Sequence, residues 1–135
     1  MPCLNVSTNV NLEGVNTSPI LSEISKAVAN IIGKPEAYVM VLLKGSVPMS
    51  FGGSEENSAF GELTSIGGLN ADVNKKLSAA IAAILEDKIS VSRSRFFIKF
   101  TDTKASSLKL LGDLLWHMLR SHSFSHWSDG CLHQH

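Results

Sequence analysis

The chain opens with MPCLNVSTNV (residues 1–10), a stretch along which polar residues alternate with less polar ones. One side of an extended chain would carry Leu4, Val6, Thr8 and Val10. Such alternation predicts a β-strand with one face on a core and the other facing solvent or a partner. We expect the rest of the fold to be organised around this strand, which has Pro2 at its head.

Pro2 has a possible chemical role. A small second residue normally permits removal of the initiator Met1, which would leave Pro2 with a free secondary amine. An amine at the head of a buried strand can act as a base in proton transfer. The alternative is that the Met-Pro start is incidental and serves no chemistry.

A helix and a second strand follow. Apolar residues recur at helical spacing after the turn-like segment 11–18, and Ser18 is the expected N-cap ahead of Pro19. Gly33 and Pro35 end this helix. The continuous apolar run 38–43 is typical of a strand covered on both faces.

The same order then repeats. Residues 60–66 predict a strand, Gly67 and Gly68 a turn, 71–88 a helix and 95–101 a strand. Two βαβ units in tandem, with both helices on one side of a mixed four-stranded sheet, predict an α+β fold of the split-βαβ, ferredoxin-like type. Because the helices cover only one face of the sheet, the apolar strands also predict self-association.

Four motifs taken together identify a family. They are Pro2 opening a strand, Gly33-Lys34-Pro35, the segment 49–54 (MSFGGS) and the segment 65–68 (SIGG). In this combination the chain resembles the macrophage migration inhibitory factor and D-dopachrome tautomerase family, most closely its plant members. The resemblance covers residues 1 to about 103 and implies a tautomerase-type fold. It also implies a homotrimer in which the sheets form a closed ring and a reactive proline lies in a pocket between neighbours.

The resemblance implies a keto–enol tautomerase that acts on an aryl pyruvate such as phenylpyruvate, or on a dopachrome-like substrate. It assigns Pro2 as general acid/base, Lys34 as the group that engages the substrate carboxylate and Ile66 as a pocket residue that offers its backbone. Burial and the Lys34 charge would lower the amine pKa from about 8 toward neutrality. Neither a metal nor an organic cofactor is expected. The structural alternatives are a solvated helix-end lysine for Lys34 and ordinary core packing for Ile66.

Two positions depart from the animal members of the family. Phe97 and Lys99 stand where those members have a tyrosine and an asparagine that line the neighbour's pocket. Phe97 keeps the shape without the hydroxyl. Lys99 could lower the proline pKa further, pair with a carboxylate, clash with Lys34, fill the pocket or point to solvent. The animal CxxC motif is absent near 58–61, so no thiol–disulfide chemistry is implied.

A competing hypothesis is a cytokine-like binding protein that keeps the fold and signals through a protein receptor. Lys99 and the divergent C-terminus favour this hypothesis, whereas Pro2, Lys34 and Ile66 favour the enzyme. A third possibility is that the altered C-terminus makes the chain a dominant-negative partner of normal subunits.

Residues 104–135 are expected to form a separate, divergent segment. A helical stripe begins at Leu108 and continues through Leu111, Leu115 and Met118. A Ser- and His-rich tail follows, for which disorder is a better interpretation than a metal site. Its candidate ligands are His122, His126, Cys131, His133 and His135.

Composition restricts the remaining classes of function. The 135 residues suit one domain, and the formal net charge is zero at pH 7 with no basic stripe, so no nucleic-acid partner is expected. The two cysteines, Cys3 and Cys131, are too few for a disulfide framework. Neither a leader nor a membrane-spanning run is evident, which favours a cytoplasmic protein that would be exported only by an unconventional route.

Overall fold

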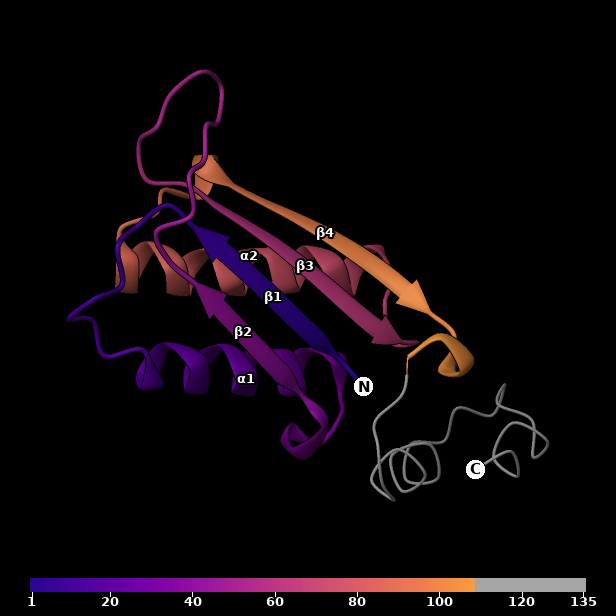
Figure 1. Cartoon of the computed structure of the whole chain (residues 1–135). Coiled ribbons are helices and arrows are strands. Elements are labelled where there is room, and N and C mark those ends of the chain that lie inside the picture. The colour runs from indigo at the N-terminus through magenta and orange to yellow at the C-terminus, as the bar shows by residue number, and fades with distance from the viewer. Residues whose placement is uncertain (109–135) are drawn as a thin grey trace, which may run out of the picture.

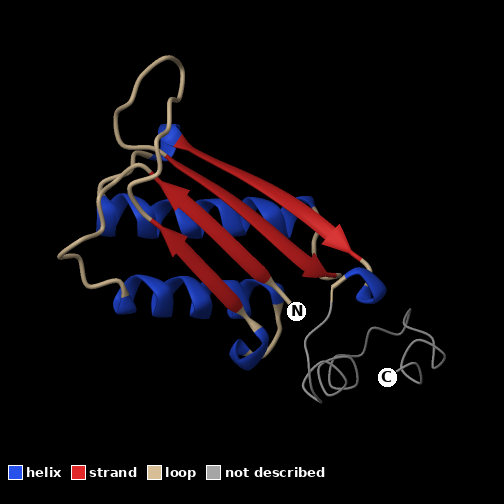
Figure 2. Ribbon diagram, in the orientation of Figure 1, coloured by secondary structure: helices blue, strands red, loops and turns tan. Residues whose placement is uncertain are grey.

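The four strands form one mixed sheet in the order β2-β1-β3-β4. A computed structural model of the chain describes residues 1–108. Its helices and strands are β1 (Cys3–Thr8), α1 (Ser18–Ile32), β2 (Met40–Lys44), β3 (Ala59–Ile66), α2 (Ala71–Ile89) and β4 (Phe96–Thr103). β1 pairs with β2 and β3 with β4 in parallel, while β1 and β3 are antiparallel. Both helices lie on one side of the sheet (Figures 1 and 2), which confirms the split-βαβ prediction.

The core lies between the helices and the sheet. Alternate residues of β1 and β3 point into it, and each helix contributes one apolar stripe at helical spacing. Its fully buried members include Leu4, Val6, Ile24, Val28, Leu63, Leu77, Ile81 and Leu85. The apolar residues of the predicted strand and helix patterns all point into this layer. The sequence therefore determines which face of each element is buried.

Among the boundaries that differ from the sequence prediction, two lie at the starts of α1 and β2. Ser18 is not the N-cap of α1, because the helix begins at Ser18 itself and Thr17 occupies the cap without a side-chain hydrogen bond. Asn16 Oδ1 accepts the Ser18 N–H instead, at 3.3 Å. Tyr38 lies in the single-turn 3-10 helix Glu36–Tyr38, and the strand predicted over 38–43 begins at Met40.

The face of the sheet away from the helices is uncovered by the described chain. The prediction that the second strand is covered on both faces is therefore wrong for one copy: Met40 is 58% and Leu42 37% exposed. Phe60 on β3 and Phe97 on β4 are also exposed. We call this side of the sheet, with its outward residues on β1 to β4, the open face.

The described part of the C-terminal segment is short. After β4 the chain makes a single 3-10 turn at Ala105–Ser107. The predicted helical stripe beyond Leu108 and the predicted histidine-rich tail lie outside the described residues. Within residues 1–108, neither α1 nor α2 is both long and apolar enough to cross a membrane.

Candidate active site

The head of β1 meets the ends of β3 and β4 at one end of the sheet. Cys3 pairs with Thr64, so the buried Pro2, one residue earlier, stands opposite Ser65. Ser65 in turn pairs with Asp102 of β4. Figure 1 shows the N-terminus at the end of the sheet where β3 and β4 finish. Since side chains alternate along a strand, Pro2, Ser65 and Asp102 form a row on the helix-covered face.

Lys34 reaches this row from the end of α1. Gly33 adopts a left-handed conformation with φ 81°, which ends the helix, and the Gly33 and Lys34 N–H groups both donate to Ala29 O. The turn directs the Lys34 side chain inward, where it is only 4% exposed and its Nζ donates to Ile66 O at 2.5 Å. Lys34 is therefore not the solvated helix-end lysine of the structural alternative.

The electrostatics of the site favour an uncharged α-amine. The pKa of the Met1 α-amine is lowered to about 4. The largest cause is burial, followed by the Lys34 charge and by a hydrogen bond with Lys34. Burial also lowers the pKa of Lys34, opposed by its hydrogen bond with the N-terminal amine and by the negative charge of Asp102. Two amines thus share one water-poor space, and the α-amine has its lone pair available for a proton at neutral pH.

Ile66 contributes through both its side chain and its backbone. The side chain is fully buried, and its carbonyl oxygen is the acceptor for Lys34 Nζ. The turn that follows is held by Asp102 Oδ1, which accepts the Gly67 N–H at 3.0 Å. Sequence reasoning missed Asp102, because only the parallel register of β3 and β4 brings it beside this turn.

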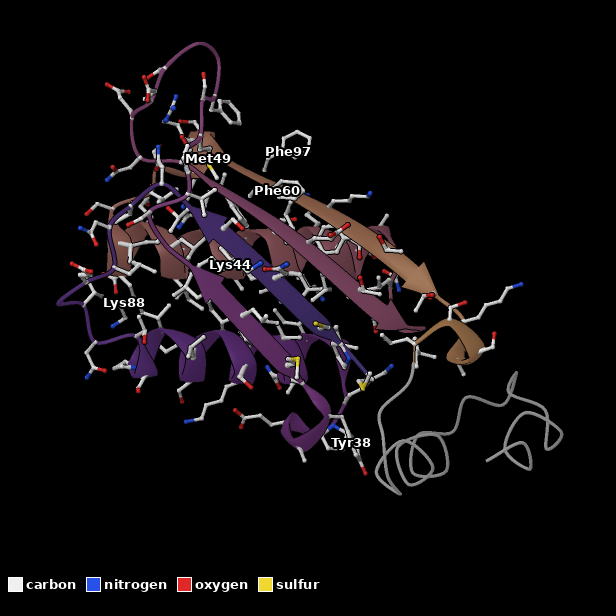
Figure 3. All side chains as sticks on the ribbon, in the orientation of Figure 1. Tyr38, Lys44, Met49, Phe60, Lys88 and Phe97 are labelled. Carbon is white, nitrogen blue, oxygen red and sulfur yellow. The ribbon has the colours of Figure 1, made fainter. Side chains whose placement is uncertain are left out.

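Phe97 and Lys99 lie elsewhere in the same chain. Phe97 stands five positions before Asp102 on β4, so it lies roughly 17 Å along the strand from the Pro2 row. Its ring stacks on Phe60 with centroids 6.4 Å apart, and Figure 3 shows this pair near the end of the sheet opposite the N-terminus. Lys99 Nζ lies 3.6 Å from Glu62 Oε2. The structure thus brings together Pro2, Lys34 and Ile66 but not Phe97 or Lys99, which point out from the open face.

The segment 49–54 contains a tight turn at Phe51–Ser54. Gly52 and Gly53 have positive φ, and Phe51 and Ser54 exchange both backbone hydrogen bonds. Arg95 packs its guanidinium 5.4 Å from the Phe51 ring centroid. It also donates to five acceptors of the loop, namely the carbonyls of Phe51, Ser54, Glu56 and Asn57 and the hydroxyl of Ser58. Sequence reasoning missed Arg95, whose role depends on this loop folding back over the start of β4.

The fold and the site together define the class of small split-βαβ proteins with the tautomerase fold. A family model described as macrophage migration inhibitory factor (MIF) matches residues 1–115. The chain belongs to the macrophage migration inhibitory factor family. The matched region continues past residue 103, where the resemblance was expected to stop.

Individual relatives agree with this assignment. The chain is 35% identical over 108 residues to a macrophage migration inhibitory factor homolog of Trichuris trichiura, covering 80% of this chain and 94% of the relative. A Brugia malayi homolog is also 35% identical, over 83% of this chain and 96% of the relative. The solved structure of the Trichinella spiralis protein superposes with a TM-score of 0.75 at 34% identity, covering 82% of this chain and 96% of that one. The homologue from Prochlorococcus marinus gives a TM-score of 0.76 at 31% identity, over 82% of this chain and 96% of that one.

Proposed function

We propose that this chain is a keto–enol tautomerase whose base is the α-amine at the head of β1, carried by Pro2 after removal of Met1. Membership of a family of tautomerase and cytokine-like proteins supports this function in general terms. The observation that carries the proposal is the buried Lys34 ammonium beside that amine.

The same two effects act on any amine at this end of β1. Burial disfavours the charged form, and a neighbouring ammonium disfavours it further. Pro2 is itself buried at the head of β1, so the new amine would lie at the same end of the strand as Lys34. Its pKa is therefore expected to lie below the usual value of about 8, so that the base is unprotonated at neutral pH.

The proposed substrate is an aryl pyruvate. Its carboxylate would bind the Lys34 ammonium through charge-assisted hydrogen bonds. The amine then removes a proton from the carbon beside the carbonyl, the C–H electron pair forms a C=C bond, the C=O π pair moves onto oxygen, and the protonated amine donates the proton to that oxygen. In the reverse direction the protonated amine returns the proton to carbon. These proton transfers balance without an oxidant, a metal or an organic cofactor.

A second copy of the chain would complete the pocket. Exposed apolar residues on the open face favour self-association. At its centre, the buried Asn5 Oδ1 has no hydrogen-bond partner within the described chain. In the homotrimer that we propose, Phe97 of a neighbour would line the substrate ring, and Lys99, held near Glu62, would add a second cation at the edge of the pocket.

Loss of phenylpyruvate enol absorbance tests the proposal. The enzyme is the chain beginning at Pro2, compared with Pro2→Gly and with the exposed control Lys76→Met. Turnover is expected to fall at least a hundredfold in Pro2→Gly and to stay unchanged in the control. Equal turnover in all three folded proteins would refute catalysis by Pro2.

A cytokine-like binding role is the second candidate. It is favoured by the side-by-side Phe60 and Phe97 rings, which are 39% and 61% exposed. A pure binding protein would not need a free Pro2 amine, so Pro2→Gly would leave receptor binding unchanged. We propose a cytoplasmic location for the enzyme and an extracellular one for the binding role.

A further inference from the structure

Asp102 connects β4 to the turn that follows β3. Its Oδ1 accepts the Gly67 N–H at 3.0 Å. Ser65, its register partner, donates its hydroxyl to Gly67 O at 2.8 Å. Both backbone polar groups of Gly67 are therefore held by side chains, which fixes the orientation of the preceding peptide and of the Ile66 carbonyl.

This turn bears directly on Lys34. Ile66 O is the acceptor for Lys34 Nζ, and Gly68 packs beside the lysine stem. A Cβ added at Gly68 would lie 3.7 Å from Lys34 Cε and 3.0 Å from Ile32 Cγ2. Asp102 therefore reaches Lys34 through a continuous series of contacts, Asp102 to Gly67, Ile66 O and then Lys34 Nζ.

Asp102 also contributes charge. Two groups favour the Lys34 ammonium: the N-terminal amine through a hydrogen bond, and the Asp102 carboxylate through its negative charge. Burial works against the positive form of Lys34, and the Asp102 carboxylate favours it. A lysine that must bind a carboxylate has to stay charged in this water-poor setting, and the negative charge of Asp102 favours that charged form.

We propose that Asp102 is a positioning residue of this site, whose carboxylate fixes the Ile66–Gly67 turn that holds Lys34 and whose negative charge acts on the Lys34 ammonium. For its consequence in turnover this inference rests on the proposed tautomerase function. The arrangement of Asp102, Gly67 and Lys34 is a property of the free protein and is tested there as well.

Two substitutions separate the hydrogen bond from the charge. Asp102→Asn keeps an oxygen for the Gly67 N–H at nearly the same volume but removes the charge, whereas Asp102→Ala removes both. Glu55→Gln, at an exposed position in the 51–58 loop, is the control for loss of one acidic residue.

The first measurement is the NMR titration of Lys34 in the substrate-free chain, with the lysine signal assigned by its absence in Lys34→Met. Asp102→Asn is expected to shift the Lys34 titration to lower pH, and Glu55→Gln to leave it in place. A Lys34 titration that is identical in Asp102→Asn, Glu55→Gln and the parent chain would overturn the proposal, whether or not the chain is a tautomerase.

The second measurement is turnover of phenylpyruvate enol. Asp102→Asn is expected to raise KM about fivefold with little change in kcat, since a nearby charge that assists carboxylate binding is lost. Asp102→Ala is expected to lower kcat as well, because the turn is no longer held. Kinetics of both variants equal to those of Glu55→Gln would overturn the positioning role. Absence of turnover in the parent chain would instead refute the proposed function, while the titration would still decide the role of Asp102.

Discussion

Replacing Lys34 with methionine is expected to remove activity while leaving the fold nearly as stable. Lys34 is 4% exposed, and its Nζ donates to the Ile66 carbonyl at 2.5 Å. Methionine has an unbranched side chain of similar length that can fill the same space without charge. The substitution therefore tests the charge of Lys34 more than its volume.

Two opposing terms set the change in the free energy of unfolding. Leaving the buried Ile66 carbonyl without its donor costs about 1–3 kcal/mol. Removing a buried ammonium relieves a desolvation penalty of several kcal/mol. This gain is partly offset, because the stabilising interactions that the charge makes in the fold are lost as well. We therefore expect Lys34→Met to change the free energy of unfolding by less than about 2 kcal/mol.

The effect on turnover is expected to be much larger. Truncating one member of a desolvated, hydrogen-bonded charge pair costs roughly 2–5 kcal/mol, so kcat/KM is expected to fall by about 30-fold to 5,000-fold. The amine pKa is also expected to rise, but only in part, because burial, the largest single cause of its lowering, remains.

Urea unfolding and phenylpyruvate enol turnover, both on the chain beginning at Pro2, measure the two effects. Lys76→Met is the matched control, since Lys76 is an exposed lysine on α2. The reasoning is refuted if Lys34→Met retains kcat/KM within about threefold of the control, because the charge would then play no part in binding the substrate.

Three further outcomes are expected. Because the α-amine pKa of about 4 in the fold lies below the unfolded value of about 8, the unfolded chain binds more protons between these pH values. Stability from this group is complete above pH 8 and declines toward pH 4, so urea midpoints of the parent chain should fall more steeply with acidification than those of an N-acetylated chain. Arg95→Ala is expected to lower the free energy of unfolding by about 1–3 kcal/mol and to speed amide exchange at Ser54, because the loop loses its guanidinium donors. Arg95→Lys is expected not to restore the lost stability, and unchanged exchange at Ser54 would contradict this prediction. Gly68→Ala is expected to lower the free energy of unfolding, measured in urea, by about 1–3 kcal/mol, because Gly68 has φ +79° and the new methyl group would lie 3.0 Å from Ile32 Cγ2. Gly14 also has positive φ but open space around it, so a smaller loss for Gly68→Ala than for Gly14→Ala would contradict this prediction.

The helices, the strands and their buried faces could be predicted from the sequence because each is a periodic pattern within one segment. Leu4 and Val6 mark the core side of β1, and Gly33 marks the end of α1. The Ser18 cap could not be predicted correctly, because the helix begins one residue earlier than expected, with Thr17 at the cap and Asn16 accepting the Ser18 N–H.

The site was less accessible to sequence reasoning because its contacts cross between segments. Pro2, Lys34 and Ile66 were identified through the family resemblance, but spacing alone left Lys34 equally compatible with a solvated helix end. Its burial depends on where the end of β3 lies relative to α1. Asp102 and Arg95 hydrogen-bond to loops that are distant in sequence. Neither residue belongs to a sequence motif that predicts such a contact.

The central claim is that the α-amine at the head of β1 is the catalytic base, and one titration tests it directly. The Pro2 amine of the mature chain, labelled with ¹⁵N-proline, would be titrated by NMR, and the pH dependence of kcat/KM for phenylpyruvate would be measured on the same sample. We predict a single midpoint shared by both curves and lying below about 8, with activity lost as pH falls through it. An amine that titrates near its usual value, or turnover that does not follow its titration, would contradict the claim.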